Sequence, residues 1–381
     1  MATGIIAEYN PFHKGHKYHI DKTKKITNDD IVAIISGNFV QRGEPAMTDK
    51  HTRTKMALLN GVSMVLELPV EYATGSADVF ARGAVGILNS CGIIKQISFG
   101  SEKGNTDAFE KTAVLLNNEP GNFKMLIKKH LNTGLSYPLA RNKALEDYFG
   151  ESLDFLNKPN NILALEYIRQ IKRLNSNIKP LTIERIVSQY NSTILSGEIS
   201  SASAIRAAIM DKNDSALNSV PHNCTELLRN NKIPALNDYS HILSYILRTG
   251  TPEEISKYAD ITEGLENRII NCSFKNISDL INSIKTKRYT YTKLQRAILH
   301  IILEITKEDQ KKEPQYIRIL GFRRDKKYLL SELIEKASLP VVTNVKKNEK
   351  LLKREITASD IYNILRDNEK GTEYTAPMVI L

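Results

Sequence analysis

Two histidines near the start of the chain, His13 and His16, are the residues whose type and spacing most clearly suggest chemistry. They lie in the string Glu8-Tyr9-Asn10-Pro11-Phe12-His13-Lys14-Gly15-His16, directly after the short apolar run Thr3–Ala7. A loop between a strand and a helix presents free backbone N–H groups and a positive dipole end to phosphate. The proline restricts this loop, and the glycine lets the backbone approach a ligand closely. As hydrogen-bond donors, or as imidazolium, the two histidines could neutralise charge that grows on a phosphate in a transition state.

A serine cluster, Ser200-Ser201-Ala202-Ser203, stands just before Arg206 and opens a second predicted helix. Hydroxyls and backbone N–H groups at a helix start suit phosphate oxygens, and the arginine adds a donor fork one turn later. The alternative is helix capping, which needs only one of the serines. The arginine favours a second phosphate site.

Other polar residues follow predicted strands and so face the same edge of a parallel sheet. Ser36 and Asn38 end the second strand, with Arg42 close behind, and are candidates for a substrate pocket, although a plain turn with an asparagine cap explains them too. Gly100 follows the fourth strand, where a flat ligand could lie against the backbone. Asn160 and Asn161 open a helix, where asparagine is also a good N-cap. Arg185 ends the last strand.

The elements that would position these residues alternate between strands and helices through the first half of the chain. Short apolar runs predict strands at Thr3–Ala7, Ile31–Ser36, Met64–Leu68, Gln96–Phe99 and Pro180–Ile186. Amphipathic spacing predicts helices at His16–Thr27, Thr48–Asn60, Ser76–Ser90, Asn160–Leu174 and Ser201–Met210. This alternation predicts an α/β fold with a Rossmann-like parallel sheet.

After Asp211 helical patterns dominate, as in Tyr291–Ile305, and Val341–Asn344 is the one later strand that we predict. We therefore expect two domains, residues 1–210 and a mainly helical 211–381. Residues 261–381 hold 23 lysines and arginines and 16 acidic residues, a net charge of +7 within a chain total of +10. That charge fits either a basic solvated surface or a face that binds nucleic acid.

The three cysteines, Cys91, Cys224 and Cys272, are far apart and show no metal-site spacing, which favours a reducing cytoplasm. No apolar run is long enough for a membrane span, and no signal peptide is recognisable at the N-terminus. We expect no membrane association, and no protein partner is evident.

The string His13-Lys14-Gly15-His16 resembles the HxGH signature of the nucleotidyltransferase superfamily, whose members activate a substrate by its attack on the α-phosphate of a nucleotide. The longer pattern Gly4-Ile-x-Ala-Glu8-Tyr-Asn10-Pro-Phe-His13-x-Gly-His16 resembles the bacterial tRNA(Met) cytidine acetate ligase family. The resemblance continues over essentially the whole chain, through 36–45, 66–69, 99–102, 159–163 and 316–322. The 199–206 segment resembles the second superfamily signature, ISSTxIR, with Ser203 where threonine usually stands.

The resemblance implies that acetate and ATP form acetyl-adenylate, and that the acetyl group passes to N4 of the wobble cytidine of elongator tRNA(Met). It implies catalytic roles for His13 and His16. It implies ATP binding by the following residues: Ala7, Glu8, Tyr9, Asn10, Pro11, Phe12, His13, Lys14, Gly15, His16, Ile20, Gly100, Asn160 or Asn161, Arg185, Ser201, Ser203 and Arg206.

We also expect Mg²⁺ bound to the ATP phosphates, since no protein metal cage is visible. Given the family, the basic residues Arg323, Arg324, Lys326, Lys327, Lys346 and Lys347 become candidates for tRNA contact, which makes 211–381 the expected tRNA-binding domain. Two alternatives remain at this point. One is a metabolic nucleotidyltransferase that adenylates a small substrate without RNA, and the other is a non-catalytic nucleotide-sensing RNA-binding protein.

Overall fold

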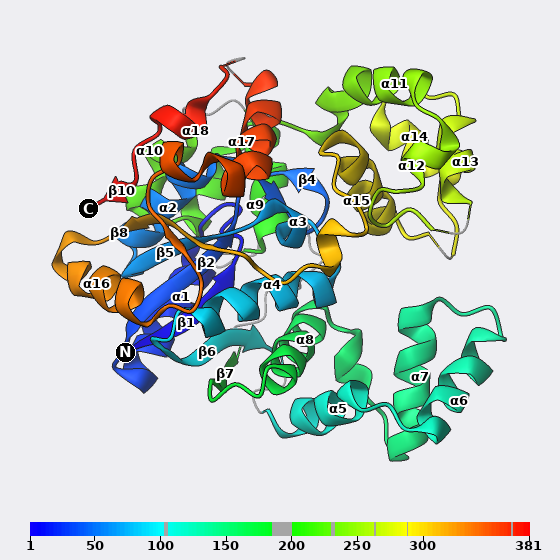
Figure 1. Cartoon of the computed structure of the whole chain (residues 1–381), viewed down its shortest axis with the longest axis horizontal. Helices are drawn as coiled ribbons and strands as arrows, with labels where there is room; N and C mark the ends of the chain where they lie inside the picture. Colours follow the sequence, from blue (N-terminus) through cyan, green and yellow to red (C-terminus); the bar gives the residue numbers. More distant parts are fainter. Residues whose placement is uncertain (103–105, 185–199, 230–232, 263, 288, 367–368) are drawn as a thin grey trace.

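A computed structural model describes residues 1–381 except 103–105, 185–199, 230–232, 263, 288 and 367–368. Its centre is one sheet in the order β10-β8-β5-β2-β1-β6-β7, with β9 paired to β8 (Figure 1). The strands are β1 (Ala2–Ala7), β2 (Asp30–Ser36), β5 (Met64–Leu68), β6 (Ile94–Ser101), β7 (Lys179–Glu184), β8 (Ile317–Phe322), β9 (Val341–Val342) and β10 (Val379–Ile380). A separate hairpin pairs β3 (Phe39–Val40) with β4 (Glu44–Pro45).

The five predicted strands form the parallel part of the sheet, which confirms the predicted α/β fold. β1 pairs with β2 and β6, β2 pairs with β5, and β6 pairs with β7, all in parallel. The apolar runs of β1, β2 and β5 are buried because helices cover both faces of the sheet, whereas β7, at the edge of the sheet, is mostly half-buried. Five parallel strands bring five carboxyl ends, and the loops after them, to one edge of the sheet.

The predicted helices of the first half are present, with ends shifted by one or two residues. They are α1 (Lys14–Thr27), α2 (Lys50–Leu59), α4 (Ala77–Ser90), α8 (Pro159–Arg173) and α9 (Ala202–Met210). At α1, α2 and α9 the preceding residue, His13, Asp49 or Ser201, accepts a hydrogen bond from a first-turn N–H group. The side chains at these starts therefore act as caps, outside the helices proper.

The remaining helices include three that the sequence patterns did not single out, between β6 and β7. The full set is α3 (Val70–Ala73), α5 (Asp107–Asn117), α6 (Gly121–Leu131), α7 (Tyr137–Phe149), α10 (His222–Arg229), α11 (Ser240–Thr249), α12 (Pro252–Ile255), α13 (Leu265–Ile270), α14 (Ile277–Ile284), α15 (Tyr291–Ile302), α16 (Lys327–Lys336), α17 (Glu349–Ile364) and α18 (Thr372–Thr375). Short 3₁₀ turns cover Asp154–Asn157, Asp214–Ser219, Leu236–Tyr239, Asp309–Lys311, Arg324–Lys326 and Lys346–Asn348.

Two helical lobes project on the same side of the sheet and lie apart from each other in Figure 1, α6–α7 in one and α11–α15 in the other. The α11–α15 lobe has its own apolar core, to which Phe39 and Val70 of the first half also belong. Gly43, at φ +79°, packs so closely on α15 that a Cβ there would lie 2.5 Å from the backbone nitrogen of Arg296. The β3–β4 hairpin is thus fitted directly against this lobe.

The end of the chain returns to the sheet, where β9 confirms the short strand predicted at Val341–Asn344 and β8 and β10 were not predicted. β8 pairs antiparallel with β5, and β9 and β10 pair in parallel with β8. All six residues of β8 are buried, so the strand lacks the alternation that would have marked it. The division at residue 210 stays a prediction, and the sheet takes strands from both segments.

A buried cluster of charged side chains joins this C-terminal segment to α2 and β5. Lys50 Nζ lies 2.6 Å from Glu67 Oε1 and 2.7 Å from Glu373 Oε1. Arg318 completes the ring, with Nη1 2.8 Å from Glu67 Oε2 and a second, shorter contact to Glu373. All four side chains are at most 5 % exposed. Removal of any one member would therefore leave the buried ring with one unbalanced charge.

In the described part of the chain, no helix combines the length and the apolar character that a membrane crossing needs.

Candidate functional site

A cavity of about 240 Å³ lies at the carboxyl ends of β1, β6 and β7. These are the sheet positions where ligands bind in parallel α/β proteins. Of the residues expected at a nucleotide site, the cavity is lined by Ala7, Glu8, Tyr9, Asn10, His13, Gly15, His16, Gly100, Asn160, Ser201, Ser203 and Arg206, together with Arg42 from the expected substrate pocket. The two phosphate-site candidates, 190 residues apart in sequence, therefore open on one cavity.

The histidine loop is held by its own backbone. His13 Nδ1 accepts a hydrogen bond from the Gly15 N–H at 3.0 Å, and His16 Nδ1 accepts from the His13 N–H at 3.2 Å. The two rings stack with centroids 3.7 Å apart and planes 27° apart. Because each Nδ1 is an acceptor, a neutral ring must carry its proton on Nε2. Both histidines thus have Nε2–H as their remaining donor, and both line the cavity.

Three of the expected nucleotide-binding residues are buried and do not line the cavity. Phe12 is fully buried, and its ring centroid lies 4.9 Å from that of Tyr9 and 5.6 Å from that of His16. Pro11 is buried, and Ile20 is a fully buried core residue of α1. Lys14, at the first position of α1, is partly exposed and also lies outside the cavity lining.

Arg206 joins the two halves of the site. Its Nη1 donates to the Asn10 carbonyl oxygen at 2.9 Å, and its Nη2 donates to Glu44 Oε1 at 3.1 Å. The α9 helix start is thereby tied to both the histidine loop and the β3–β4 hairpin. Ser201 Oγ accepts from the Ala204 N–H at 3.1 Å, so one serine does cap the helix. Ser203 lines the same cavity.

Glu8 places a carboxyl group in the cavity wall, where its Oε1 accepts from the Gln41 N–H at 2.8 Å. Burial raises the pKa of Glu8 above its ordinary value, against the lowering effect of the Gln41 hydrogen bond and the Arg206 charge. The residue therefore keeps its proton to a higher pH than an exposed glutamate does.

The two asparagines at the start of α8 have different surroundings. Asn160 lines the cavity and donates to Glu102 Oε1 at 2.8 Å. Asn161 is fully buried, accepts from the Glu102 N–H at 3.0 Å and donates to the Phe155 carbonyl at 2.9 Å. The geometry thus offers Asn160, and not Asn161, to a ligand. Arg185, the other residue expected beside them, lies outside the described residues.

Ser36 and Asn38 do not line the cavity. Ser36 is fully buried. Asn38 accepts from the Lys50 N–H at 2.9 Å and donates to Ser359 Oγ at 3.0 Å, which ties the start of α2 to α17. Arg42 alone of the three pocket candidates reaches the cavity wall.

Arg53 was missed by sequence reasoning, although it organises the loops at this edge of the sheet. Its guanidinium is fully buried and donates to the carbonyls of Thr48 at 3.0 Å, Glu8 at 2.8 Å and Ser36 at 2.9 Å. It also donates to the Gly37 carbonyl. One side chain therefore fixes the chain just beyond β1 and β2. An arginine inside a predicted amphipathic helix gives no signal of this, because three of its four carbonyl partners are 16 to 45 residues away.

Several other cavity residues were also missed: Ile6, Tyr18, His19, Gln41, Phe80, Phe99, Leu163, Tyr167, Ile183 and Glu184. Most are apolar or aromatic residues on predicted strands and helices, where such spacing ordinarily marks core.

The basic residues expected to contact tRNA lie away from this cavity. The Arg323 N–H donates to the Ser63 carbonyl at 3.0 Å, which places the turn at the amino end of β5, across the sheet from the cavity. Lys326 Nζ lies 3.0 Å from Asp30 Oδ1, at the amino end of β2. Arg324 and Lys327 are exposed on the same turn. Lys346 and Lys347 are exposed on the 3₁₀ turn before α17.

Comparison with known proteins gives a consistent picture. A model of the HIGH Nucleotidyl Transferase family matches residues 1–376. Proteins named tRNA(Met) cytidine acetate ligase from Clostridium perfringens and Acetivibrio thermocellus are 42 % and 40 % identical to the chain, and each alignment covers 99 % of both proteins. Two crystal structures of Thermotoga maritima TmcAL, one apo and one bound with alpha-thio ATP, superpose with TM-scores of 0.94 and 0.92, at 32 % identity over the full length of both chains.

Proposed function

The chain belongs to the tRNA(Met) cytidine acetate ligase family of HIGH nucleotidyltransferases, and we propose that it carries out the reaction of this family. Acetate attacks the α-phosphate of ATP, pyrophosphate leaves, and the resulting acetyl-adenylate donates its acetyl group to N4 of the wobble cytidine of elongator tRNA(Met). We place this enzyme in the cytoplasm, where tRNA is available.

One observation carries the proposal: the histidine loop and the start of α9 line the same cavity at the carboxyl ends of the strands. We assign the triphosphate to this pair of phosphate-binding elements. The Nε2–H groups of His13 and His16 would donate to phosphate oxygens as negative charge grows on them. The adenosine would rest against Gly100, with Asn160 beside it. The related structure bound with alpha-thio ATP supports nucleotide binding by this fold.

Positioning and charge stabilisation account for the first step without a covalent enzyme intermediate. Acetate and the α-phosphate, held in line, react in an effectively intramolecular displacement. Arg42 and Arg206 border the cavity and suit a carboxylate or phosphate partner. In the second step the exocyclic amine of the cytidine attacks the acetyl carbonyl, a proton leaves the nitrogen, and AMP departs with the electron pair of the broken C–O bond.

Mg²⁺ fits the residues that are present as an ion held mainly by the nucleotide. The described cavity lining contains two carboxylates, Glu8 and Glu184, and the described residues hold no cluster of three metal-ligating side chains. Magnesium commonly takes one or two carboxylates together with phosphates and water. When bound, it would supply charge neutralisation at the phosphates.

The anticodon position of the acceptor suits this site. A wobble base is unpaired, so it can enter a cavity without the cost of opening a duplex. The chain's net charge of +10 favours a polyanionic acceptor.

ATP–pyrophosphate exchange tests the proposal and separates it from the alternatives. We expect exchange that requires acetate and does not require tRNA. Exchange with another small acid, and none with acetate, would favour a metabolic nucleotidyltransferase. No exchange with any acid from a protein that binds ATP would favour a non-catalytic sensor.

A further inference from the structure

The outward face of α1 carries a row of lysines that begins at the cavity. Lys14, Lys17, Lys22 and Lys25 fall within about 140° of the helix circumference at 3.6 residues per turn. We call these four residues the α1 lysine row. Asp21 is the acidic residue on this face, and both its oxygens bond Lys17 Nζ, at 2.5 and 2.6 Å.

The far half of the row is exposed. Lys22 and Lys25 are both exposed, and neither forms an ion pair with a described residue. Lys22 Nζ lies 5.6 Å from the centroid of the Tyr18 ring, and Tyr18 itself lines the cavity. Proteins that bind single-stranded nucleic acid combine aromatic rings, on which bases stack, with cations that attract the phosphates. An aromatic ring at the cavity with cations behind it offers this combination.

The row leads from the cavity toward the basic turn at the other edge of the sheet. From Lys14 to Lys25 the helix rises about 17 Å, the length of about five stacked nucleotides at 3.4 Å each. Asp30 lies three residues after the end of α1, and its Oδ1 is 3.0 Å from Lys326 Nζ. Burial, together with the positive charge of Arg323, lowers the pKa of Lys24 on the last turn of α1. The basic turn with Arg323 and Lys326 therefore lies beside the last turn of α1.

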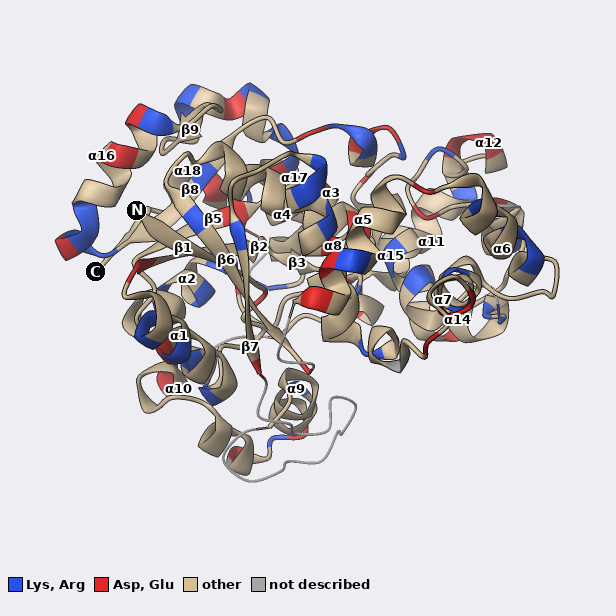
Figure 2. Cartoon of the chain, turned by 90° about the horizontal axis from the view of Figure 1, so that it is seen from below, with Lys and Arg blue, Asp and Glu red and all other residues tan. Residues whose placement is uncertain are grey.

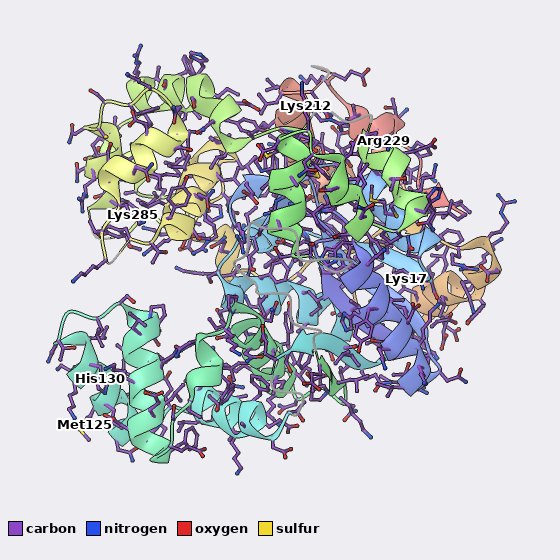
Figure 3. All side chains as sticks on the ribbon, turned by 180° about the vertical axis from the view of Figure 1, so that it is seen from behind. Lys17, Met125, His130, Lys212, Arg229 and Lys285 are labelled. Carbon is purple, nitrogen blue, oxygen red and sulfur yellow. The ribbon has the colours of Figure 1, made fainter. Side chains whose placement is uncertain are left out.

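Figures 2 and 3 show where α1 lies in the molecule. In Figure 2, basic residues recur along α1. In Figure 3, Lys17 lies on the side of the molecule that also carries Arg229 and Lys212, whereas Met125, His130 and Lys285 mark the two helical lobes at the opposite end.

We propose that the α1 lysine row binds the RNA phosphate backbone next to the reacting base and guides that strand from the cavity toward the Arg323–Lys327 turn. This inference rests on the proposed function for the identity of the RNA. In this proposal the Arg323–Lys327 turn binds the RNA strand at the end of the row that lies away from the cavity, and not at the cavity entrance.

The test compares two matched lysine pairs. Lys22→Gln/Lys25→Gln removes two charges from the row, and Lys124→Gln/Lys128→Gln removes two exposed lysines from α6 that likewise form no ion pair with a described residue. Glutamine keeps the helix propensity of lysine, so both variants should fold. Binding of elongator tRNA(Met) is measured against salt, and acetylation is measured against tRNA concentration.

For Lys22→Gln/Lys25→Gln we expect tRNA affinity about tenfold weaker near 0.15 M salt, and a log–log salt slope shallower by between 1 and 2. The KM for tRNA should rise by the same factor with kcat unchanged. Acetate-dependent exchange without tRNA should keep the unsubstituted rate, because neither lysine lines the cavity.

Unchanged affinity and slope for the α1 pair would overturn the inference, as would an equal or larger loss for the α6 pair. Absence of tRNA binding by the unsubstituted chain at low salt would overturn it too. Failure of the proposed function looks different: tRNA binds with the expected dependence on Lys22 and Lys25, and no acetyl group is transferred.

Discussion

Replacement of Arg53 by lysine should loosen the edge of the sheet that carries the site. The guanidinium donates to four backbone carbonyls, those of Thr48, Glu8, Ser36 and Gly37. A lysine keeps the charge, but its donors share one nitrogen and cannot reach carbonyls spread around a planar fork. We expect it to keep at most two of the four bonds.

The magnitude follows from the two carbonyls that would lose their partner. A buried polar group without a hydrogen bond costs about 1–3 kcal/mol, so Arg53→Lys should lower the free energy of unfolding by about 3 kcal/mol. With an unfolding entropy of about 2.1 cal/mol/K per residue, that change lowers the Tm of a chain of this length by about 4 °C.

The same substitution should weaken ATP binding, because the Glu8 carbonyl begins the histidine loop. Thermal unfolding followed by circular dichroism gives the first quantity, and the KM for ATP in acetate-dependent exchange gives the second. Arg248→Lys, at an exposed position on α11, is the control and should change neither. A Tm within 1 °C of the unsubstituted protein, with an unchanged KM, would refute this account of Arg53.

Three further predictions follow from the site and the buried charges. Asn160→Ala should raise the KM for ATP with little change in Tm, whereas Asn161→Ala should lower the free energy of unfolding by about 2 kcal/mol through two lost buried bonds, as urea unfolding would show; the reverse pattern would contradict the assignment. Glu355 has a pKa raised well above its ordinary value by burial and by the Glu67 charge. The folded state therefore holds this proton to a higher pH than the unfolded chain does. The free energy of unfolding should fall as the pH rises past the ordinary glutamate pKa. Glu355→Gln keeps an acceptor for the Val70 N–H and should remove that part of the pH dependence, so unchanged pH profiles of urea unfolding would oppose it. His13→Ala and His16→Ala should each lower kcat for exchange about 10²- to 10³-fold, read by pyrophosphate exchange, and full activity in either would remove the proposed charge stabilisation.

Local sequence signals were enough to predict the parallel half of the fold. Short buried strands followed by capped helices depend on neighbouring residues alone, and the histidine loop belongs to this class because its hydrogen bonds join residues two or three apart. Ser201–Arg206 was also visible locally, as serines at a helix start.

Features that depend on distant partners were not predictable. β8 carries Arg318 in a fully buried strand, which is stable only because Glu67 and Glu373 meet it from 251 and 55 residues away. The sequence predicted Asn38 in the substrate pocket, whereas in the structure its side chain donates to Ser359, 321 residues later. The net charge did not predict where the basic residues lie relative to the site, because the basic turn near Arg323 is across the sheet from the cavity.

The central claim is tested most directly by mass spectrometry of elongator tRNA(Met) after incubation with the enzyme, ATP and isotope-labelled acetate. We predict the labelled acetyl group on N4 of the wobble cytidine, dependent on ATP and lost with His16→Ala. A folded, ATP-binding protein that leaves this cytidine unlabelled would contradict the proposed function.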